Sequence, residues 1–129
     1  MKYLFLSTNS RSGAALASSI LNAHSNISFS IEKLKYFAFV KERFSEVNNT
    51  NIERVLKEVK LRLKIRWNIP FDIEMCRKLI GLNFNHSHLY TCFMRSIYKK
   101  DTKSKILGEC EGVSWMQIPF FLSEIPNSK

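Results

Sequence analysis

The chain has 129 residues, of which 45% are apolar and 24% are charged, an ordinary globular composition that argues against a disordered or collagen-like chain. This length has room for one hydrophobic core, so a single domain over residues 1–129 is expected. The formal net charge of +9 favours an anionic partner, but charge alone does not choose between nucleic acid, an acidic membrane surface and a small anionic ligand.

The N-terminal segment is predicted to form a strand, a turn and a helix. Residues 2–7 (KYLFLS) are a short apolar run followed by polar residues, which is the pattern of a parallel strand covered on both faces. From Ser12 onward, alanine, leucine and isoleucine recur at helical spacing. This spacing predicts a helix that ends near residues 24–25 and packs closely on a sheet. Residues 27–29 are predicted to be extended.

The middle of the chain, about residues 30–100, is predicted to be largely helical. Helices are expected, in chain order, at residues 30–44, 52–67, 73–82 and 86–99, with a loop at 48–51 and a break at Pro70. The second of these helices has an apolar stripe formed by Ile52, Val55, Leu56, Val59 and Leu63. Six of the twenty Lys and Arg residues lie at positions 54–66, where they form either a solvated helical face or a binding surface.

The C-terminal part, residues 104–125, is predicted to add one strand and one helix to the sheet. Residues 105–108 (KILG) are the candidate second strand, and the helix at residues 115–125 is interrupted or begins near Pro119.

The three cysteines, Cys76, Cys92 and Cys110, are widely spaced and form no CxxC pair, so neither a disulfide framework nor a zinc ribbon is indicated. Reduced thiols are typical of cytosolic proteins, and a cytoplasmic location is therefore expected. The apolar run at residues 3–7 is too short for the core of a signal peptide. No run has the length of a membrane span.

The turn between the first strand and the first helix has the features of an anion-binding site. Backbone N–H groups and a helix N-terminus meet there, Arg11 adds a planar set of donors suited to phosphate or sulfate, and Gly13 permits close backbone approach. The alternative is a plain strand-to-helix connection with an exposed arginine. The sequence Gly13-Ala14-Ala15 lacks the lysine and hydroxyl of a Walker A loop, which disfavours a nucleotide kinase.

The segment FLSTNSRSGAALASSILNAHSNISFSIE resembles the opening of the PAPS-dependent sulfotransferases, whose loop reads roughly PRSGTTLL and is followed by a leucine-rich helix. The matching positions are Arg11, Ser12, Gly13, Leu16, Leu21 and His24. Near the other end, ILGECEGVSWMQIPFFLSEIPNSK is similar to the family's strand, GEKTP-like turn, helix and FPNAK-like segment.

This resemblance implies an α/β fold of the P-loop-like three-layer type, with a parallel sheet and a largely helical middle. It also implies an incomplete fold, because the family continues beyond the position of residue 129 into a strand that ends in an RDPR-like motif. We therefore expect a fragment or truncated reading frame of a sulfotransferase, with weak or no activity alone.

The resemblance further implies transfer of a sulfuryl group from PAPS to an acceptor hydroxyl or amine, with no metal. The loop at residues 7–16 would hold the 5′-phosphosulfate through Ser10, Arg11, Ser12, Gly13, Ala14 and Ala15. Glu32 would be the catalytic general base, or, alternatively, a glutamate of a helical first turn.

Two departures from the family weaken the expected activity. Ala14 and Ala15 stand where the family has hydroxyl residues, and each lost hydrogen bond costs about 1 kcal/mol. In the GEKTP-like turn at residues 108–112, Cys110 replaces the lysine that would help neutralise the transferring group.

Other patterns leave further alternatives open. His86 and His88 are either metal ligands or part of a loop or helix cap, and Trp67, Trp115, Phe120 and Phe121 are interpreted as core rather than as a base-stacking platform. The rival function is a non-catalytic basic anion- or nucleic-acid-binding module that uses residues 54–66. Nucleic acid is disfavoured because the aromatics and motifs of such domains are missing. The expected partners are the nucleotide donor and an acceptor.

Overall fold

The computed structural model describes residues 2–7, 12–31, 33–98 and 105–111, together with the single positions 119 and 123. The chain divides into two compact units. We call Met1–Lys33 with Asp101–Lys129 the sheet unit, and Leu34–Lys100 the helical unit. The predicted helix at residues 115–125 lies outside the described residues, apart from the two single positions. In the part of the chain that is described, no helix is long and apolar enough to cross a membrane.

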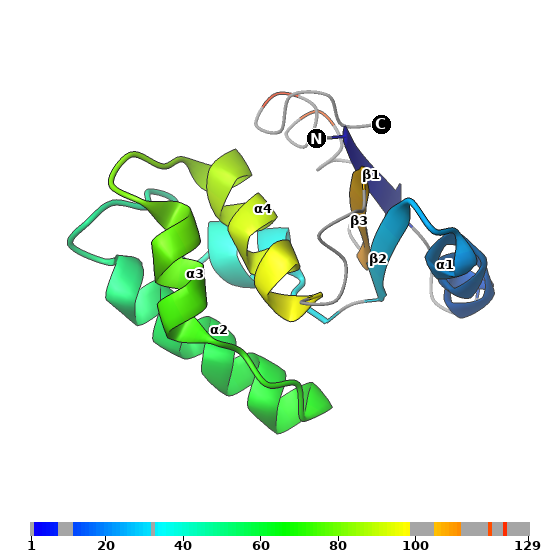
Figure 1. Ribbon diagram of the computed structural model, residues 1–129, viewed down its shortest axis with the longest axis horizontal. Coiled ribbons are helices and arrows are strands. Elements are labelled where there is room, and N and C mark those ends of the chain that lie inside the picture. The colour runs from blue at the N-terminus through cyan, green and yellow to red at the C-terminus, as the bar shows by residue number, and fades with distance from the viewer. Residues whose placement is uncertain are drawn as a thin grey trace. The chain divides into compact units, whose positions relative to one another are not determined.

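The described sheet unit is an α/β arrangement with a three-stranded parallel sheet (Figure 1). Its elements are β1 (Lys2–Ser7), α1 (Ala14–Ala23), β2 (Ile27–Ile31) and β3 (Ile106–Glu111). Parallel strands need a crossover connection, and α1 provides it between β1 and β2. The strand order is β1-β3-β2, so the strand that comes last in the chain is the central one. The predicted first strand, first helix, extended piece and parallel pairing are confirmed.

Gly108 lies at the middle of β3, between Leu4 of β1 and Phe29 of β2 in the register of the sheet. A Cβ atom at this glycine would meet the carbonyl oxygen of Leu4 and would lie 2.5 Å from Cδ2 of Phe29. The fully buried Phe29 ring therefore covers the glycine. A glycine in a strand interior often marks such a close approach.

Helix α1 packs on β2 through small and polar side chains. The side chain of Asn22 accepts a hydrogen bond from the Phe29 backbone N–H (2.8 Å) and donates one to the Phe29 carbonyl (2.7 Å). Ser18 is buried, whereas Leu16 and Ile20 are exposed. β1 is less covered than predicted, since only Tyr3 of its six residues is buried and the strand lies at an edge of the described sheet.

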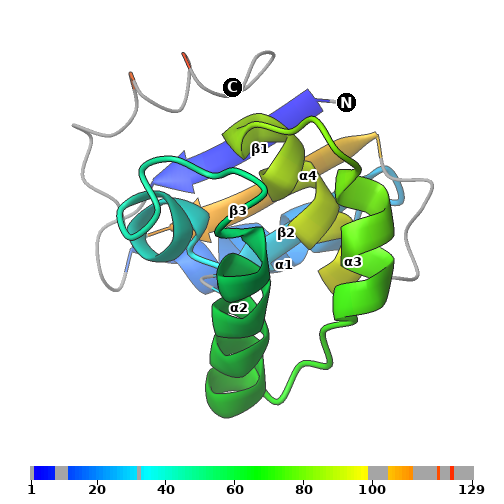
Figure 2. The same ribbon diagram turned by 90° about the vertical axis from the view of Figure 1, so that its left-hand side faces the viewer.

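The helical unit consists of a π-helical turn, η1 (Tyr36–Lys41), followed by α2 (Ile52–Trp67), α3 (Ile73–Ile80) and α4 (His86–Ile97) (Figure 2). Helix α2 has the predicted bounds, and its predicted stripe supplies the buried residues Val55, Leu56, Val59 and Leu63. Helix α3 ends earlier than predicted, at Ile80, and is followed by Gly81, whose φ of 66° favours glycine.

The core of the helical unit is aromatic and centred on Tyr36. Its ring makes edge-on contacts with Phe37, His86 and Tyr90, with centroids 5.5, 5.9 and 5.3 Å away. Its hydroxyl lies 2.9 Å from both Nδ1 and the carbonyl oxygen of His86. Tyr36 thus joins η1 to the start of α4.

The predicted helix at residues 30–44 is wrong over its first part. Ser30 and Ile31 belong to β2, and the helical structure within the described residues of this range is η1. The sequence Ile27-Ser28-Phe29-Ser30-Ile31 alternates apolar and polar residues, which is the period of a strand. Pairing with the central β3 strand extends this alternation through Ile31.

Candidate functional site

The connection between β1 and α1 is the first candidate site, and Gly13 opens the helix there. Gly13 has φ 83° and ψ 15°, a left-handed conformation that glycine adopts without steric cost. Among the described residues, apart from the two chain neighbours, no atom lies within 4 Å of the place a Cβ would occupy.

The start of α1 has the electrostatics of an anion-binding position. Its first intrahelical hydrogen bond joins Ala17 N–H to the Gly13 carbonyl (3.0 Å). Gly13 has no side chain with which to cap the helix, and the first turn contains no acidic residue. The N–H groups that precede the first bond lie at the positive end of the helix dipole, so this end can attract an anion.

Of the predicted loop residues, Ser12, Gly13, Ala14 and Ala15 lie together at the start of α1; the helix itself is labelled in Figure 1. Ser12, Gly13 and Ala15 are exposed, and Ala14 is half-buried. The remaining predicted site residues, Ser10, Arg11 and Glu32, lie outside the described residues.

The predicted GEKTP-like turn is wrong for residues 108–111, which form the last four of the six residues of β3. Cys110 is buried in register with Leu6 and Ile31. Glycine and cysteine are small and apolar enough for a central strand, and Gly108 lies beneath Phe29. Cys110 is therefore a packing residue of the sheet.

Glu109 is a fully buried carboxylic acid in the central strand, in register with Phe5 and Ser30. No role was predicted for Glu109 from the sequence. An acidic residue inside the apolar run Ile106-Leu107-Gly108-Glu109-Cys110 was the available signal, since acidic side chains are rarely buried without a partner.

The two histidines near the start of α4 point to different partners. Nε2 of His86 lies 3.1 Å from the Ser45 carbonyl, and Nε2 of His88 lies 3.1 Å from the Leu79 carbonyl. Asn85 caps the helix by accepting a hydrogen bond from the His88 N–H. The structure thus supports the cap interpretation. Among the described residues, no three His, Cys, Asp or Glu side chains are grouped to hold a metal ion.

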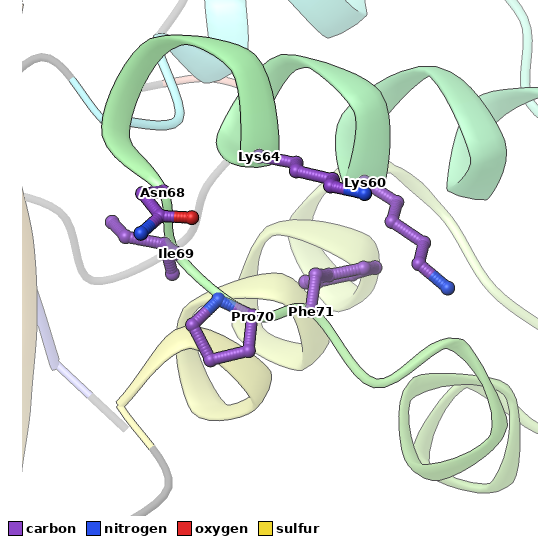
Figure 3. Close-up of a pocket in the computed structure, with 6 residues that line it drawn as sticks. All are labelled: Lys60, Lys64, Asn68, Ile69, Pro70 and Phe71. Atoms are coloured by element: carbon purple, nitrogen blue, oxygen red, sulfur yellow. The ribbon is translucent and has the colours of Figure 1, made fainter.

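A second candidate site is a pocket at the end of α2, with a volume of about 390 Å³ (Figure 3). Its lining consists of Lys60, Lys64, Asn68, Ile69, Pro70 and Phe71. Asn68 ends α2 in a left-handed conformation with φ 50°, which turns the chain back under the two lysines. Pro70 was predicted from the sequence as a break in the chain, and this pocket was not predicted.

The acidic residues of α2 are engaged in ion pairs. Arg77 donates to Glu53 and holds the pKa of that carboxyl below its ordinary value, and Glu58 pairs with Arg43 and Arg54. Lys60 and Lys64 have no ion-pair partner among the described residues. The pocket rim is therefore cationic.

Comparison of the chain with protein-family models, curated proteins and solved structures found no match. Function is therefore inferred from the chain's own residues and their geometry.

Proposed function

We propose that the connection between β1 and α1, residues 7–16, binds the 5′-phosphosulfate of PAPS, and that the protein is sulfotransferase-like. The observation that carries this proposal is the left-handed Gly13, which starts α1 with no side chain of its own and, among the described residues beyond its chain neighbours, with no atom within 4 Å of the position of a Cβ. Such a helix start offers backbone N–H groups to a phosphate. The resemblance of the Arg11-Ser12-Gly13 sequence to the family loop supports the same ligand.

In this proposal the sheet unit is the core of a P-loop-like three-layer fold. Arg11 neutralises the phosphosulfate, with hydroxyl donors from Ser10 and Ser12. The Glu32 carboxylate accepts the proton of an acceptor hydroxyl or amine, the acceptor atom bonds to sulfur, and the bond between sulfur and the phosphate oxygen breaks. Adenosine 3′,5′-bisphosphate leaves with the electron pair of that bond.

Binding is expected to be better retained than turnover. Ala14 and Ala15 offer no hydroxyl hydrogen bonds, and two such bonds at about 1 kcal/mol each correspond to roughly 30-fold in affinity. Cys110 is buried in β3 and supplies no cation to the transferring sulfuryl group. We therefore expect measurable nucleotide binding and slow transfer.

The proposal is tested by calorimetric titration of the chain with adenosine 3′,5′-bisphosphate and with PAPS. Arg11→Ala is expected to abolish binding, because it removes the bidentate phosphate contact. The combined change Ala14→Thr and Ala15→Thr is expected to tighten binding roughly 30-fold, because it restores two hydroxyl donors.

Arg54→Ala is the matched control, because it removes one exposed cation of α2 and leaves the β1–α1 connection intact. Equal weakening by Arg11→Ala and Arg54→Ala would contradict the proposal. Salt-dependent binding to arbitrary duplex DNA that survives Arg11→Ala would instead favour the basic nucleic-acid-binding module.

A further inference from the structure

Large apolar side chains project outward from the C-terminal half of α2. Leu61 is 57% exposed, Ile65 is 73% exposed and Trp67 is 45% exposed, so the interpretation of Trp67 as a core residue is wrong. Leu61 and Ile65 are four residues apart and therefore adjacent on one helix face. Since α2 buries its opposite stripe in the helical unit, the helix is apolar on two sides.

Cations surround these apolar side chains. Lys60, Lys64 and Arg66 are exposed, and none has an ion-pair partner among the described residues. Positions 59–71 contain no acidic residue, and the two acids nearer the helix start are already paired with arginines. The side of α2 that carries Leu61 and Ile65 thus combines positive charge from Lys60 and Lys64 with exposed aliphatic surface.

Arg62 differs from these cations because its side chain packs on the interior side of α2. Its guanidinium lies 4.7 Å from the centroid of the Phe39 ring, and its Nε donates to the Leu34 carbonyl (3.2 Å). At about 3.6 residues per turn, Lys60, Leu61, Lys64 and Ile65 share the side of α2 opposite its buried stripe. We define these four residues as the outer basic face.

We propose that the outer basic face of α2 binds a membrane surface that contains anionic lipids. A helix whose exposed face carries lysines beside leucine and isoleucine can lie in the interface plane, where the apolar side chains enter the headgroup region and the cations meet lipid phosphates. The proposal is independent of nucleotide binding at the β1–α1 connection.

The charge and the exposed apolar side chains of this face favour an anionic membrane over nucleic acid and over a second copy of the chain. Nucleic acid would engage the cations, but its phosphates gain nothing from the exposed Leu61 and Ile65 side chains. A second copy of the chain packed face to face would place Lys60 and Lys64 opposite like charges, which is unfavourable. An anionic bilayer is the partner that complements both kinds of side chain.

The pocket at the end of α2 adjoins this face. Figure 3 shows the Lys60 and Lys64 side chains on one side, with Pro70 and Phe71 facing them. A lipid headgroup that enters the pocket would contact the ammonium groups of the two lysines and the apolar side chains of Pro70 and Phe71. The pocket therefore extends the same surface chemistry beyond the helix.

The test is flotation of the full chain with phosphatidylcholine vesicles, with and without about one third phosphatidylserine. We expect salt-sensitive binding to the anionic vesicles and little binding to the neutral ones. The change Lys60→Gln with Lys64→Gln is expected to weaken binding about 30-fold, on the basis of the usual contribution of each lysine near an anionic surface.

The change Leu61→Ser with Ile65→Ser keeps the charge and is expected to weaken binding about tenfold or more, because insertion of apolar side chains is lost. Leu82→Ser and Lys78→Gln are matched controls at exposed positions outside α2, and both should bind like the unaltered chain. Full binding by the Leu61→Ser, Ile65→Ser variant would overturn the proposal. So would equal binding to neutral and anionic vesicles, or binding to duplex DNA alone.

Discussion

At the scale of single residues, the buried thiols of the helical unit are the clearest source of pH dependence. Burial raises the pKa of Cys76 from its ordinary value of 9.0 to about 12, and burial raises the pKa of Cys92 to about 11. Both thiols are buried, one in α3 and one in α4. The folded chain therefore keeps protons that the unfolded chain releases.

The free energy of unfolding is expected to fall as pH rises from about 9 to about 11. Below pH 9 both thiols are protonated in the folded and in the unfolded chain. Above pH 9 the thiols of the unfolded chain ionise, which lowers the free energy of unfolding by up to about 1.4 kcal/mol per pH unit for each thiol. Urea denaturation across this range measures the slope. The combined change Cys76→Ala and Cys92→Ala should flatten it, and an unchanged slope in that variant would show that other groups cause the effect.

The residues of the candidate site could be predicted where the sequence pattern that indicates them is local. Gly13 beside two alanines, after a strand and a polar turn, indicates a helix start from the sequence alone, and the left-handed glycine agrees with it. The pocket and Glu109 were not predictable in the same way. The pocket needs the chain to turn back at Asn68, and the burial of Glu109 needs strands from both ends of the chain.

At the scale of elements, the central strand β3 depends on a residue that has no side chain. Gly108→Ala is expected to destabilise the chain by about 3 kcal/mol, because the added methyl group meets the Leu4 carbonyl and the Phe29 ring. Urea denaturation measures the loss. Gly13→Ala is the matched control, since its positive φ costs about 1 kcal/mol without any steric contact. Equal effects of the two substitutions would contradict the close-approach argument.

The bounds of a helix or strand could be predicted from the sequence where a single period of apolar residues dominates the segment. Helix α2 was predicted to the residue because its stripe from Ile52 to Leu63 repeats over several turns. The segment 27–31 was divided wrongly because Ser30 and the residues after it also resemble a helix start. Pairing with β3 places Ser30 and Ile31 in the strand, and this pairing joins residues that are far apart in sequence.

At the scale of the whole molecule, the division into a sheet unit and a helical unit predicts separable local stability. Gly108→Ala should accelerate amide hydrogen exchange in β1, β2, β3 and α1. Tyr36→Phe should accelerate exchange in α2, α3 and α4, because it removes the hydroxyl that contacts His86 at a cost of about 1–3 kcal/mol. Exchange measured by mass spectrometry on peptides from both units reports the pattern. Equal acceleration of both units by either substitution would show that they open together.

The Asn22 side chain gives the sheet a property that stability measurements alone do not reveal. Its amide occupies the N–H and the carbonyl of Phe29 at the edge of the described sheet, as the backbone of a further strand would. A β-strand from another chain that adds to β2 must first displace this amide, and so loses two hydrogen bonds before it gains any. One asparagine in α1 thus acts against edge-to-edge aggregation at the middle of the strand.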